Sequence, residues 1–525
     1  MEKQRGMRFA EGSLSQMTKA RALAITIVSS AALLSGCPAE SMQSRKEAAP
    51  VEHPMRADQL FIENATIVDV RKGLLLPGMN IAISRGQITT IAPRGSLAAD
   101  SSAQIVDATG KFVVPGYNDM HVHVMGEDDL ADSLALMLAN GITGFRQMSG
   151  SEALLEQRRK GGLPIRNDEP ALLAMPGPIL TPVNARTPEM ASALVRKQQA
   201  AGADFIKIGL VSPIVLKAAL EESHRDGIPA LGHVPPDVDA ITASNEGMHS
   251  IEHLGPGDSV MIACSMESAA LQGEAPALPA FLKIPFAIPF SDQIVAHFLK
   301  RILVNPSMGL SSKDFDRIRL AVSTYSEAKC HSTAAVFTTN KTWQVPTLIR
   351  LKNSHLADSA EFTNDLNLKY VDADRLNLWR EVTKEFIEKV SPKDKQILRD
   401  AYSLDLKLVK LLDADGVRMM AGSDAGPGWI GFSLHTEFDE LATAGLSPLH
   451  ILQMTTINAA GFLGRTSTMG TVEQGKVADL VVLDANPLDD AGNLHRINAV
   501  IRSGFYRSST DLANLKAGVA ASVSR

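Results

Sequence analysis

The fold is decided by the stretch Val113-Val114-Pro115-Gly116-Tyr117-Asn118-Asp119-Met120-His121-Val122-His123. Within it, an apolar run leads into a Pro-Gly break and then reaches two histidines that are separated by one residue. Residues i and i+2 of a β-strand point to the same side, so His121 and His123 can present two imidazoles to one point. Two imidazoles at one strand end indicate a metal site, although most His-x-His pairs are ordinary surface or core histidines.

The composition is that of a globular protein. A chain of 525 residues has room for one large domain with a small one, or for about two to three domains. Its apolar content of 45% and charged content of 21% are ordinary. A net charge of −6 provides no clustered basic surface of the kind that nucleic acid requires, so we expect no nucleic-acid partner.

Residues 1–37 are predicted to be a signal peptide outside the fold. Lys19 and Arg21 precede the apolar run Ala22–Leu34, which is too short to span a bilayer comfortably. The sequence Leu34-Ser35-Gly36-Cys37 then resembles the bacterial lipoprotein signal, in which the cysteine becomes the lipidated first residue. The resemblance implies a lipid anchor at Cys37, facing the periplasm.

The residues after Cys37 refine this expectation. Pro38, rather than an aspartate, follows the cysteine, which favours the outer membrane. Residues 38–56 are rich in Ala, Ser, Pro and charge, and are predicted to be a flexible tether. The alternative is an ordinary secretory signal with a chance cysteine, which would give a soluble periplasmic or secreted protein.

Cys264 and Cys330 are the only other cysteines. Two thiols in an oxidising compartment can pair, but the sequence does not place their Cα atoms within bridging range. The pairing stays open at this point.

Short strands dominate residues 57–113. Apolar or alternating runs are separated by turn signals such as Pro77-Gly78 and Arg85-Gly86. These strands cannot form a barrel by themselves and predict one part of a β-sandwich. The runs are Phe61-Ile62 and residues 65–70, 80–84, 87–91, 105–107 and 111–114.

After Gly116 the pattern changes to strands that alternate with helices. This succession implies a parallel sheet, and its length favours a closed (β/α)₈ TIM barrel over residues 114–467. The predicted helices are Asp129–Ala139, Pro188–Ala201, Pro213–Asp226, Ile241–Glu246, Leu404–Asp415 and Pro448–Leu463. The predicted strands are Ile142–Met148, Phe205–Leu210, Pro229–Val234, Ser250–His253 and Val417–Gly422.

Active sites of such barrels lie at the carboxyl ends of the strands. Six residues with metal-binding or acid-base chemistry fall at predicted strand ends, and this coincidence is the strongest physical argument in the sequence. They are His121, His123, Lys207, His233, His253 and Asp424.

Residues from about 255 to 400 interrupt the rhythm. They contain the helical patterns Asp314–Lys329 and Asp374–Val390 and a strand at Gln344–Leu348. We expect a large helical insertion around one βα unit that covers the barrel mouth. From residue 468 the β pattern returns, so residues 468–525 are predicted to supply the second part of the sandwich and a C-terminal tail.

Together these motifs resemble the metal-dependent amidohydrolase superfamily, most closely its prolidase-like and imidazolonepropionase-related branch. The resemblance covers about residues 58–507, is weakest in the insertion, and implies a (β/α)₈ barrel with a β-sandwich from both chain ends. The motifs that carry it are His121-Val122-His123 after Pro115-Gly116, Ala203-Asp204-Phe205-Ile206-Lys207-Ile208, Gly232-His233-Val234, Ile251-Glu252-His253, Gly422-Ser423-Asp424-Ala425 and the closing segment Gly475–Asp484.

The resemblance also implies a ligand set for two divalent metal ions. His121 and His123 would bind the more buried ion beside Asp424, and His233 and His253 would bind the second. Lys207 would bridge the ions as a carbamate, because an unmodified ammonium has no acceptor for a metal. The alternative for Lys207 is a buried lysine paired with an acid. Zinc suits these ligands, and manganese or cobalt are alternatives.

This ligand set implies hydrolysis of an amide bond. A hydroxide that bridges the ions would attack the carbonyl, with Asp424 as general base and then general acid. Close relatives with a lysine in this motif look like dipeptidases that act on proline or hydrophobic C-terminal residues, and they usually hold the substrate carboxylate with a basic or tyrosine group. We therefore expect a substrate of the dipeptide or N-acyl amino acid type. The loop Leu210-Val211-Ser212-Pro213 after Lys207 contains neither residue type.

Two other functions stay open. A mononuclear cyclic-amide hydrolase or deaminase is the first, although such relatives generally lack the bridging lysine. A surface-anchored binding protein without catalysis is the second, but it would be expected to have lost a ligand position, and none is lost. The family often assembles, so a homo-oligomer is possible.

Four further residues are weaker candidates. His435 occupies a position that resembles a substrate-side histidine in relatives, and a surface or capping histidine is the alternative. Arg146 precedes Gln147 where relatives usually have Arg-Asp, which puts a role for the pair in doubt. Trp429 and Phe432 are candidates to line the pocket or to pack in the core.

Overall fold

A computed structural model describes residues 59–126, 129–273, 301–424 and 430–524. The predicted signal peptide with Cys37, the tether 38–56 and Trp429 therefore lie outside the described residues. Within the described ranges, no helix is both long enough and apolar enough to cross a membrane.

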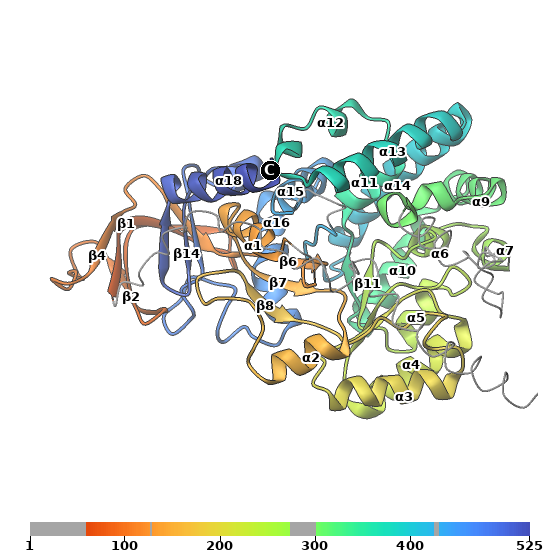
Figure 1. The fold of residues 1–525 in the computed structure, drawn as a ribbon, viewed down its shortest axis with the longest axis horizontal. Coiled ribbons are helices and arrows are strands. Elements are labelled where there is room, and N and C mark those ends of the chain that lie inside the picture. Colours follow the sequence, from red (N-terminus) through yellow and green to blue (C-terminus); the bar gives the residue numbers. More distant parts are fainter. Residues whose placement is uncertain (1–58, 127–128, 274–300, 425–429, 525) are drawn as a thin grey trace, which may run out of the picture. The chain divides into compact units, whose positions relative to one another are not determined.

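The two ends of the described chain build one mixed sheet (Figure 1). Strand β13 pairs antiparallel with β5, with Val481 opposite Val114, which joins the C-terminal strands to the N-terminal ones. The strands are β1 (Gln59–Asp69), β2 (Leu74–Ser84), β3 (Gln87–Pro93), β4 (Gln104–Asp107), β5 (Phe112–Pro115), β13 (Leu480–Leu483), β14 (Ile497–Arg502) and β15 (Phe505–Ser508). Their order is β15-β14-β13-β5-β1-β2-β3, with β4 paired to β1.

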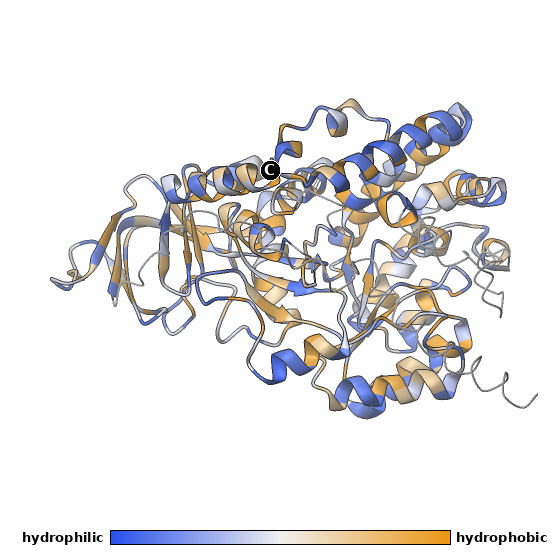
Figure 2. Cartoon of the chain, viewed as in Figure 1, coloured by the Kyte–Doolittle hydropathy of each residue, from blue (hydrophilic) through white to orange (hydrophobic). Residues whose placement is uncertain are grey.

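Alternating apolar residues of these strands form a separate core. Leu60 and Ile62 of β1 pack with Ile81 of β2 and with Leu480 and Val482 of β13, all nearly free of solvent contact. Figure 2 colours the apolar residues of these strands orange. The sheet is consistent with the predicted sandwich domain from both ends of the chain.

Parallel strands form the second part of the fold. One sheet contains β6 (Tyr117–Val122), β7 (Ile142–Gln147) and β8 (Ala171–Ala174), and the other contains β9 (Ile206–Ile208), β10 (Ala230–Gly232), β11 (Ser250–Glu252) and β12 (Trp343–Val345). All these pairings are parallel. The sequence pattern did not predict β8, because Ala171-Leu172-Leu173-Ala174 lacks the β-branched and aromatic residues that mark strands.

Backbone hydrogen bonds join the two parallel sheets on both sides. On one side, residue Met419 forms a parallel bridge with Gln344, and the Met120 N–H donates to the Ala421 carbonyl. On the other side, the Asp204 N–H donates to the Met175 carbonyl. The strands and the segment around Met419 therefore follow one another in a ring, as expected for an amidohydrolase-type barrel.

Helices connect the ring strands and bury one face against them. The first are α1 (Leu130–Ala139), α3 (Pro188–Ala200), α4 (Pro213–Asp226) and α5 (Ala240–Asn245), close to the predicted ranges, and α2 (Glu152–Arg159), which the sequence pattern did not predict. The local signals act as expected: Thr187 caps α3 at the Met190 N–H, and Gly227 ends α4 with a φ of 67°. Val215, Leu216 and Ala219 of α4 enter the main core.

The predicted insertion is divided by a strand of the ring. Helices α6 (Ser259–Ala263), α7 (Ser268–Gly273), α9 (Ser312–Ser323) and α10 (Glu327–Asn340) and the 3₁₀ helix η2 (Pro306–Gly309) lie between β11 and β12. Helices α11 (Leu348–His355), α12 (Ala360–Thr363), η3 (Leu366–Tyr370), α13 (Ala373–Lys389) and α14 (Pro392–Ala414) follow β12. The structure thus has two long connections where the sequence predicted one insertion, because β12 pairs with β11 and with the segment around Met419.

Two predicted helices are each divided by a polar break. In place of the predicted helix Asp314–Lys329, α9 ends at Ser323 and α10 begins at Glu327. Between them, the Ser326 N–H donates to the Cys264 carbonyl. Pro448–Leu463 is divided at Thr456 into α16 (Pro448–Thr455) and α17 (Ile457–Phe462).

The predicted C-terminal tail contains helix α18 (Ser509–Val523), which begins with a Ser508–Asp511 capping box and packs against α1 (Figure 1). The remaining elements of the described chain are helix α15 (Phe432–Ala444) and the 3₁₀ helix η4 (Ala491–His495).

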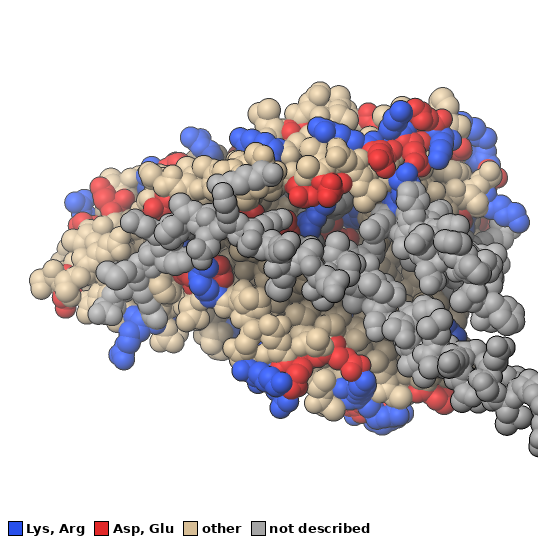
Figure 3. Space-filling model, viewed as in Figure 1, with Lys and Arg blue, Asp and Glu red and all other residues tan. Residues whose placement is uncertain are grey.

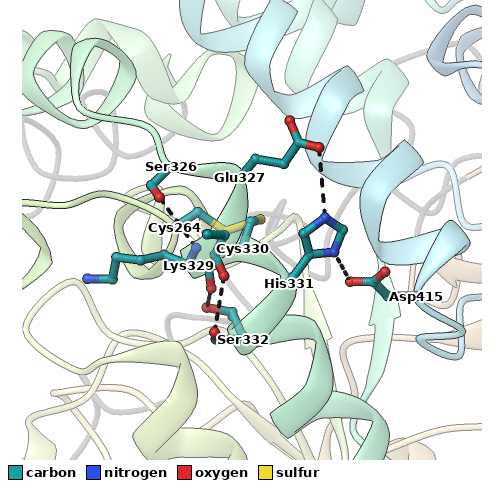
Figure 4. Close-up of a disulfide and its surroundings, with 10 residues drawn as sticks. Cys264, Ser326, Glu327, Lys329, Cys330, His331, Ser332 and Asp415 are labelled. Atoms are coloured by element: carbon teal, nitrogen blue, oxygen red, sulfur yellow. Dashed lines mark hydrogen bonds and ion pairs between the residues drawn. A yellow bond between two sulfur atoms is a disulfide. The ribbon is translucent and has the colours of Figure 1, made fainter.

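Cys264 and Cys330 form a disulfide that joins the end of α6 to α10 (Figure 4). Both cysteines are buried. Beside them, His331 Nδ1 lies 2.6 Å from an Asp415 carboxylate oxygen, which ties α10 to the end of α14. The structure thus pairs the two cysteines whose pairing the sequence left open.

Removal of this disulfide is expected to lower stability. The bond closes a loop with a sequence separation of 66, for which chain entropy predicts a contribution of about 4 kcal/mol. The double substitution Cys264→Ser and Cys330→Ser should therefore lower the urea midpoint of unfolding, and dithiothreitol should lower that of the parent chain to the same value. An unchanged midpoint in both tests would show that the bond does not constrain the unfolded chain.

Candidate metal centre

Four histidines and one aspartate meet at the carboxyl ends of the ring strands. Ring centroids are 5.4 Å apart for His121 and His123, 4.6 Å for His121 and His253, and 5.3 Å for His233 and His253. Asp424 lies among them, with carboxylate oxygens 3.4 Å from His123 Nε2, 3.5 Å from His253 Nε2 and 3.7 Å from His121 Nε2. These residues come from strand ends that are up to 303 positions apart in sequence, and the ring brings them together.

Lys207 lies in β9 beneath this cluster. Its side chain is buried, and its Nζ has no hydrogen-bond partner among the described residues. Burial lowers the pKa of Lys207 to about 8, while the charges of Glu252 and Asp424 oppose that shift. Burial is the main cause of the lowered pKa of His121 and His233, and a positive charge on Lys207 lowers it further. A neutral lysine amine is therefore more accessible here than in water.

The donor set fits a divalent cation. His121, His253 and Asp424 place one ligand atom each so that all three atoms lie within 4.8 Å of one another. Burial is the main cause of a lowered pKa at His121, His123, His233 and His253, which favours the neutral imidazole that binds metals. His121 Nε2 is buried without a hydrogen-bond partner among the described residues, which a metal bond would satisfy.

Second contacts orient three of the imidazoles. Each Nδ1 contacts an oxygen: Glu252 Oε2 at 2.7 Å from His121, Ser149 Oγ at 3.0 Å from His123, and Thr347 Oγ1 at 2.6 Å from His253. Because Nδ1 is occupied, each ring directs Nε2 towards Asp424. This is the usual arrangement behind metal-bound histidines.

Arg146 holds the carboxylate behind His121. Its guanidinium donates to both Glu252 oxygens, at 2.9 and 3.0 Å, and to the Met120 carbonyl at 2.6 Å. Ser250 Oγ donates to the same carboxylate at 2.8 Å. Arg146 and Glu252 are both fully buried, so each charge depends on the other.

Gln147 stands where relatives usually have the aspartate of an Arg-Asp pair, and its contacts show what the amide does there. Its Oε1 accepts the N–H groups of Val124 and Met125, at 3.0 and 3.1 Å, and its Nε2 donates to Ser149 Oγ. The neutral amide thus holds the turn that follows His123 and supports the hydroxyl that contacts His123. Arg146 and Gln147 therefore both act on the cluster through other residues.

Left-handed backbone conformations gather at the cluster. Non-glycine residues with positive φ include His253 (59°), Leu254 (52°), Thr347 (47°) and Asp424 (38°). Such conformations cost free energy and persist where surrounding contacts hold them. The contacts are present: the His253 N–H donates to the Val345 carbonyl, and the Asp424 N–H donates to the His121 carbonyl.

The loops after two ligands are tied together by Arg317 of α9. This buried guanidinium donates to the carbonyls of Pro236, Gly257 and Leu271, at distances of 3.0 to 3.2 Å. Pro236 follows His233 and Gly257 follows His253. A helix of the long connection thus braces both loops of the second histidine pair.

Sequence reasoning did not assign the supporting roles of Glu252, Thr347, Arg317 and Arg350. Arg350 Nε lies 3.6 Å from an Asp424 oxygen. Only Glu252 had a local signal, because it immediately precedes His253 in a strand. The other three belong to the long connections, where their partners are distant in sequence.

His435 contacts a different part of the molecule. Its Nε2 lies 2.9 Å from the Asn140 carbonyl, and its ring stacks on His495 at a centroid distance of 4.6 Å. Burial lowers its pKa to about 3. These are the contacts of a packed helix histidine, and the substrate role of His435 stays a prediction. Phe432 stacks on Tyr370 of η3 at 5.1 Å, an aromatic pair between α15 and the connection that follows β12.

Fold and cluster together define an α/β-barrel protein with a metal-binding group. Residues 349–514 match the model of the amidohydrolase family, which confirms the family resemblance that the motifs predicted. The matched segment includes Asp424, and the four histidines of the cluster and Lys207 precede it.

Curated relatives match a limited part of the chain. An adenine deaminase of Chelativorans sp. strain BNC1 is 31% identical over 195 residues, which is 33% of this chain and 32% of that protein. Adenine deaminase 3 of Rhizobium johnstonii is 30% identical over 206 residues, which is 35% of this chain and 34% of that protein. The chain thus spans about a third of the length of these relatives.

Solved structures resemble the whole fold at low identity. A bottromycin amidohydrolase superposes with a TM-score of 0.62 at 19% identity and covers 90% of this chain and 92% of its own. A Xaa-Pro dipeptidase with bound methionine gives a TM-score of 0.55 at 17% identity and covers 86% of this chain and 100% of its own. These likenesses establish the fold.

Neutralising Glu252 is expected to weaken metal binding. Glu252→Gln leaves the Arg146 charge unpaired in the core, which should cost about 3–5 kcal/mol of stability. It also removes the carboxylate behind His121, so metal affinity should fall about 10- to 100-fold. Thermal unfolding and zinc titration with a chelator competitor measure the two effects.

The matched control is Glu381→Gln, whose carboxylate is 64% exposed and 3.7 Å from Arg301. It should change stability by at most about 1 kcal/mol and leave zinc affinity unchanged. Equal zinc affinity in Glu252→Gln and the parent would show that Glu252 does not support the cluster.

Proposed function

We propose that this protein hydrolyses an amide bond of a dipeptide or N-acyl amino acid with the help of two divalent metal ions. The observation that carries the proposal is the convergence of four imidazoles, Asp424 and the buried Lys207 at one end of the strand ring. His121, His123 and Asp424 would hold one ion, and His233 and His253 the other. Zinc is the metal that these ligands suit best.

When bound, such ions lower the pKa of a coordinated water and polarise the substrate carbonyl. The chain itself supplies the proton transfers. Asp424 lies at the centre of the cluster, where it can accept a proton from the attacking water and pass it to the leaving nitrogen. Glu252, Ser149 and Thr347 hold three imidazoles so that Nε2 faces that point.

Lys207 is proposed to bridge the ions as a carbamate. Burial makes its neutral amine accessible, and the neutral amine is the form that reacts with CO₂. The carbamate would supply anionic oxygens where the Nζ of the unmodified side chain has no hydrogen-bond partner in the described part of the chain. This supports a dinuclear site over a mononuclear one.

A second candidate function is deamination of a cyclic amidine such as adenine, with a single metal ion. The curated relatives with about 30% identity are adenine deaminases, which is the observation that favours it. Release of ammonia from adenine by the metal-loaded protein, without cleavage of Xaa-Pro or N-acyl amino acids, would select this candidate. Turnover of neither class would favour a catalytically silent binding protein.

Metal analysis separates the dinuclear proposal from its rivals. We expect about two zinc ions per chain by elemental mass spectrometry, falling to about one or fewer in Lys207→Ala because the bridge is lost. Removal of metal with a chelator should abolish amide hydrolysis, and added zinc with bicarbonate should restore it.

The control for Lys207→Ala is Lys217→Ala, an exposed lysine of α4, which should retain the parent metal content. About one ion in both the parent and Lys207→Ala would reject the bridge and favour the mononuclear candidate. No metal under zinc-replete conditions would reject both.

We further propose that the protein is a lipoprotein on the periplasmic side of the bacterial envelope, anchored through Cys37. The support is the Leu34-Ser35-Gly36-Cys37 signal, followed by Pro38. Cys37→Ser should move the protein from the membrane fraction to the soluble fraction and abolish incorporation of labelled palmitate. Retention in the membrane fraction would contradict the proposal.

A further inference from the structure

Two loops at the carboxyl ends of β8 and β9 are apolar and exposed. Residues 175–185, after β8, and residues 208–216, at the end of β9 and the start of α4, contain no charged side chain. Val183 is 41% exposed, Leu210 37% and Ile214 64%. Single exposed apolar residues are ordinary on a protein surface, but a group of them beside a pocket is typical of a ligand-binding surface. We name these three side chains the apolar rim.

Backbone bonds hold the two loops against each other. Leu180 forms a parallel bridge with Ile208. The Leu180 N–H donates to the Lys207 carbonyl at 3.0 Å, and the Leu180 carbonyl accepts the Gly209 N–H at 2.9 Å. A Cβ atom at position 209 would lie 2.6 Å from the Leu180 carbonyl oxygen, so this close approach requires glycine. The members of the apolar rim therefore share one support.

This support is bonded directly to the candidate metal centre. The His233 N–H donates to the Ile208 carbonyl at 3.0 Å. Leu210 is thus two residues along the chain from a direct backbone bond to a candidate ligand. Lys207, the residue proposed to bridge the ions, immediately precedes Ile208 in β9. The apolar rim therefore lies beside the cluster.

Local contacts fix the direction of the rim side chains. Asn184 holds the loop that carries Val183, because its Oδ1 accepts the Thr181 N–H and its Nδ2 donates to the Ile179 carbonyl, both at 2.8 Å. In the first turn of α4, Val215 and Leu216 are buried in the main core, which leaves Ile214 on the exposed side. The apolar surface is thus preorganised.

The order of the ring places the apolar rim opposite Asp424. Counted from β6, β9 is the fourth member of the ring, and the segment around Met419, which leads to Asp424, is the eighth. Four steps separate these two members in either direction around the ring. Loops at the carboxyl ends of the strands surround one mouth, so the rim and Asp424 lie on opposite sides of that mouth.

We propose that the apolar rim binds the acyl group of the substrate, and that the scissile amide carries an extended aliphatic acyl chain. This inference rests on the proposed function of the site. Asp424 would protonate the leaving nitrogen, so the amino-acid part of the substrate lies on the Asp424 side. The acyl chain and the nitrogen diverge from the carbonyl carbon. The acyl chain therefore extends across the mouth towards the rim.

The chemistry of the two loops favours an N-acyl amino acid over a dipeptide. A dipeptide has an ammonium group on the acyl side of the scissile bond. Neither loop contains a carboxylate that could pair with this charge, and a cation placed on apolar surface loses hydration without compensation. An aliphatic chain gains free energy at the same place, because each methylene group leaves water.

The first test compares acyl groups on one amino acid. Zinc-loaded protein is supplied with N-acetyl-L-leucine, N-butanoyl-L-leucine, N-octanoyl-L-leucine and glycyl-L-leucine, and kcat/KM is measured for each. Transfer of one methylene group from water to apolar surface changes affinity about 2- to 4-fold. The octanoyl compound should therefore exceed the acetyl compound at least about 10-fold, and glycyl-L-leucine should be cleaved more slowly than the acetyl compound.

A second test measures binding without hydrolysis. Octanohydroxamic acid and acetohydroxamic acid each join an acyl chain to a zinc-binding group and contain no amide bond to leucine. Calorimetry on the zinc-loaded protein should show that the octanoyl compound binds at least about 10-fold more tightly.

Leu210→Gln and Ile214→Gln should each lower the octanoyl-to-acetyl ratio about 3- to 10-fold in both tests, because a polar amide replaces apolar contact area. Both side chains are exposed, so the variants should fold as the parent does. The matched control is Ile105→Gln, which changes an isoleucine of β4 that is 58% exposed in the terminal sheet. It should keep both parent ratios.

Other outcomes overturn the inference. Equal kcat/KM for the acetyl and octanoyl compounds, faster cleavage of glycyl-L-leucine than of N-acetyl-L-leucine, or octanohydroxamic acid that binds no more tightly than acetohydroxamic acid would each exclude an acyl site. Unchanged ratios in the two variants would do the same. If these variants instead convert a dimer to a monomer in sedimentation, or lose binding to phosphatidylglycerol vesicles, the rim contacts a second copy or a membrane.

Failure of the proposed function gives a different result. A parent protein that hydrolyses none of the four leucine compounds, but prefers octanohydroxamic acid through Leu210 and Ile214, is not an amide hydrolase for these substrates and still has the acyl site.

Discussion

The interaction on which the site depends is the buried contact between Arg146 and Glu252. Neither charge reaches solvent, and a buried charge without its partner costs several kcal/mol. Arg146 belongs to β7 and Glu252 to β11, so this contact spans the interior of the strand ring. Arg146 also holds the Met120 carbonyl of β6, and Glu252 holds His121. The cluster is therefore tied to three strands through one carboxylate.

The long connection after β12 contacts two residues of the cluster. Thr347 contacts His253, and Arg350 lies beside Asp424. Helix α11 begins between these two residues, and Glu437 accepts the N–H of Ile349 in its first turn. Burial raises the pKa of Glu437 well above its ordinary value, and hydrogen bonds from the backbone N–H groups of Ile349 and Leu348 oppose that shift. A short stretch of chain thus acts on the second histidine pair and on the proposed proton carrier. On the face that Figure 3 shows, the charged side chains lie mainly over the helices, whereas Arg146, Lys207 and Glu252 beside the cluster are buried.

Much of the architecture was predictable because its signals are local. Helix α4 begins at Pro213 and ends at Gly227, and period-2 apolar runs marked most of the strands. Failures occurred where tertiary contacts override local preference. Strand β8 is made of Ala and Leu, which favour helices, and it forms because β7 offers a paired edge. The break after Ser323 depends on the Cys264 carbonyl, a partner that no local pattern reveals.

By itself, the sequence predicted that His121, His123, Lys207, His233 and His253 lie at or near the ends of parallel strands, because strand periodicity and alternation with helices are local signals. The strand Val417–Gly422 that it predicted before Asp424 forms only a parallel bridge, between Met419 and Gln344. Parallel strands in one ring share an end, so this placement already implied convergence. The tertiary structure alone decided which side chains support the cluster and which groups face its open side. Glu252 with Arg146, Arg317 with the ligand loops, Cys264 with Cys330 and Arg350 with Asp424 are contacts between residues far apart in the chain. Distance and burial determine such contacts, and both arise only when the chain is folded.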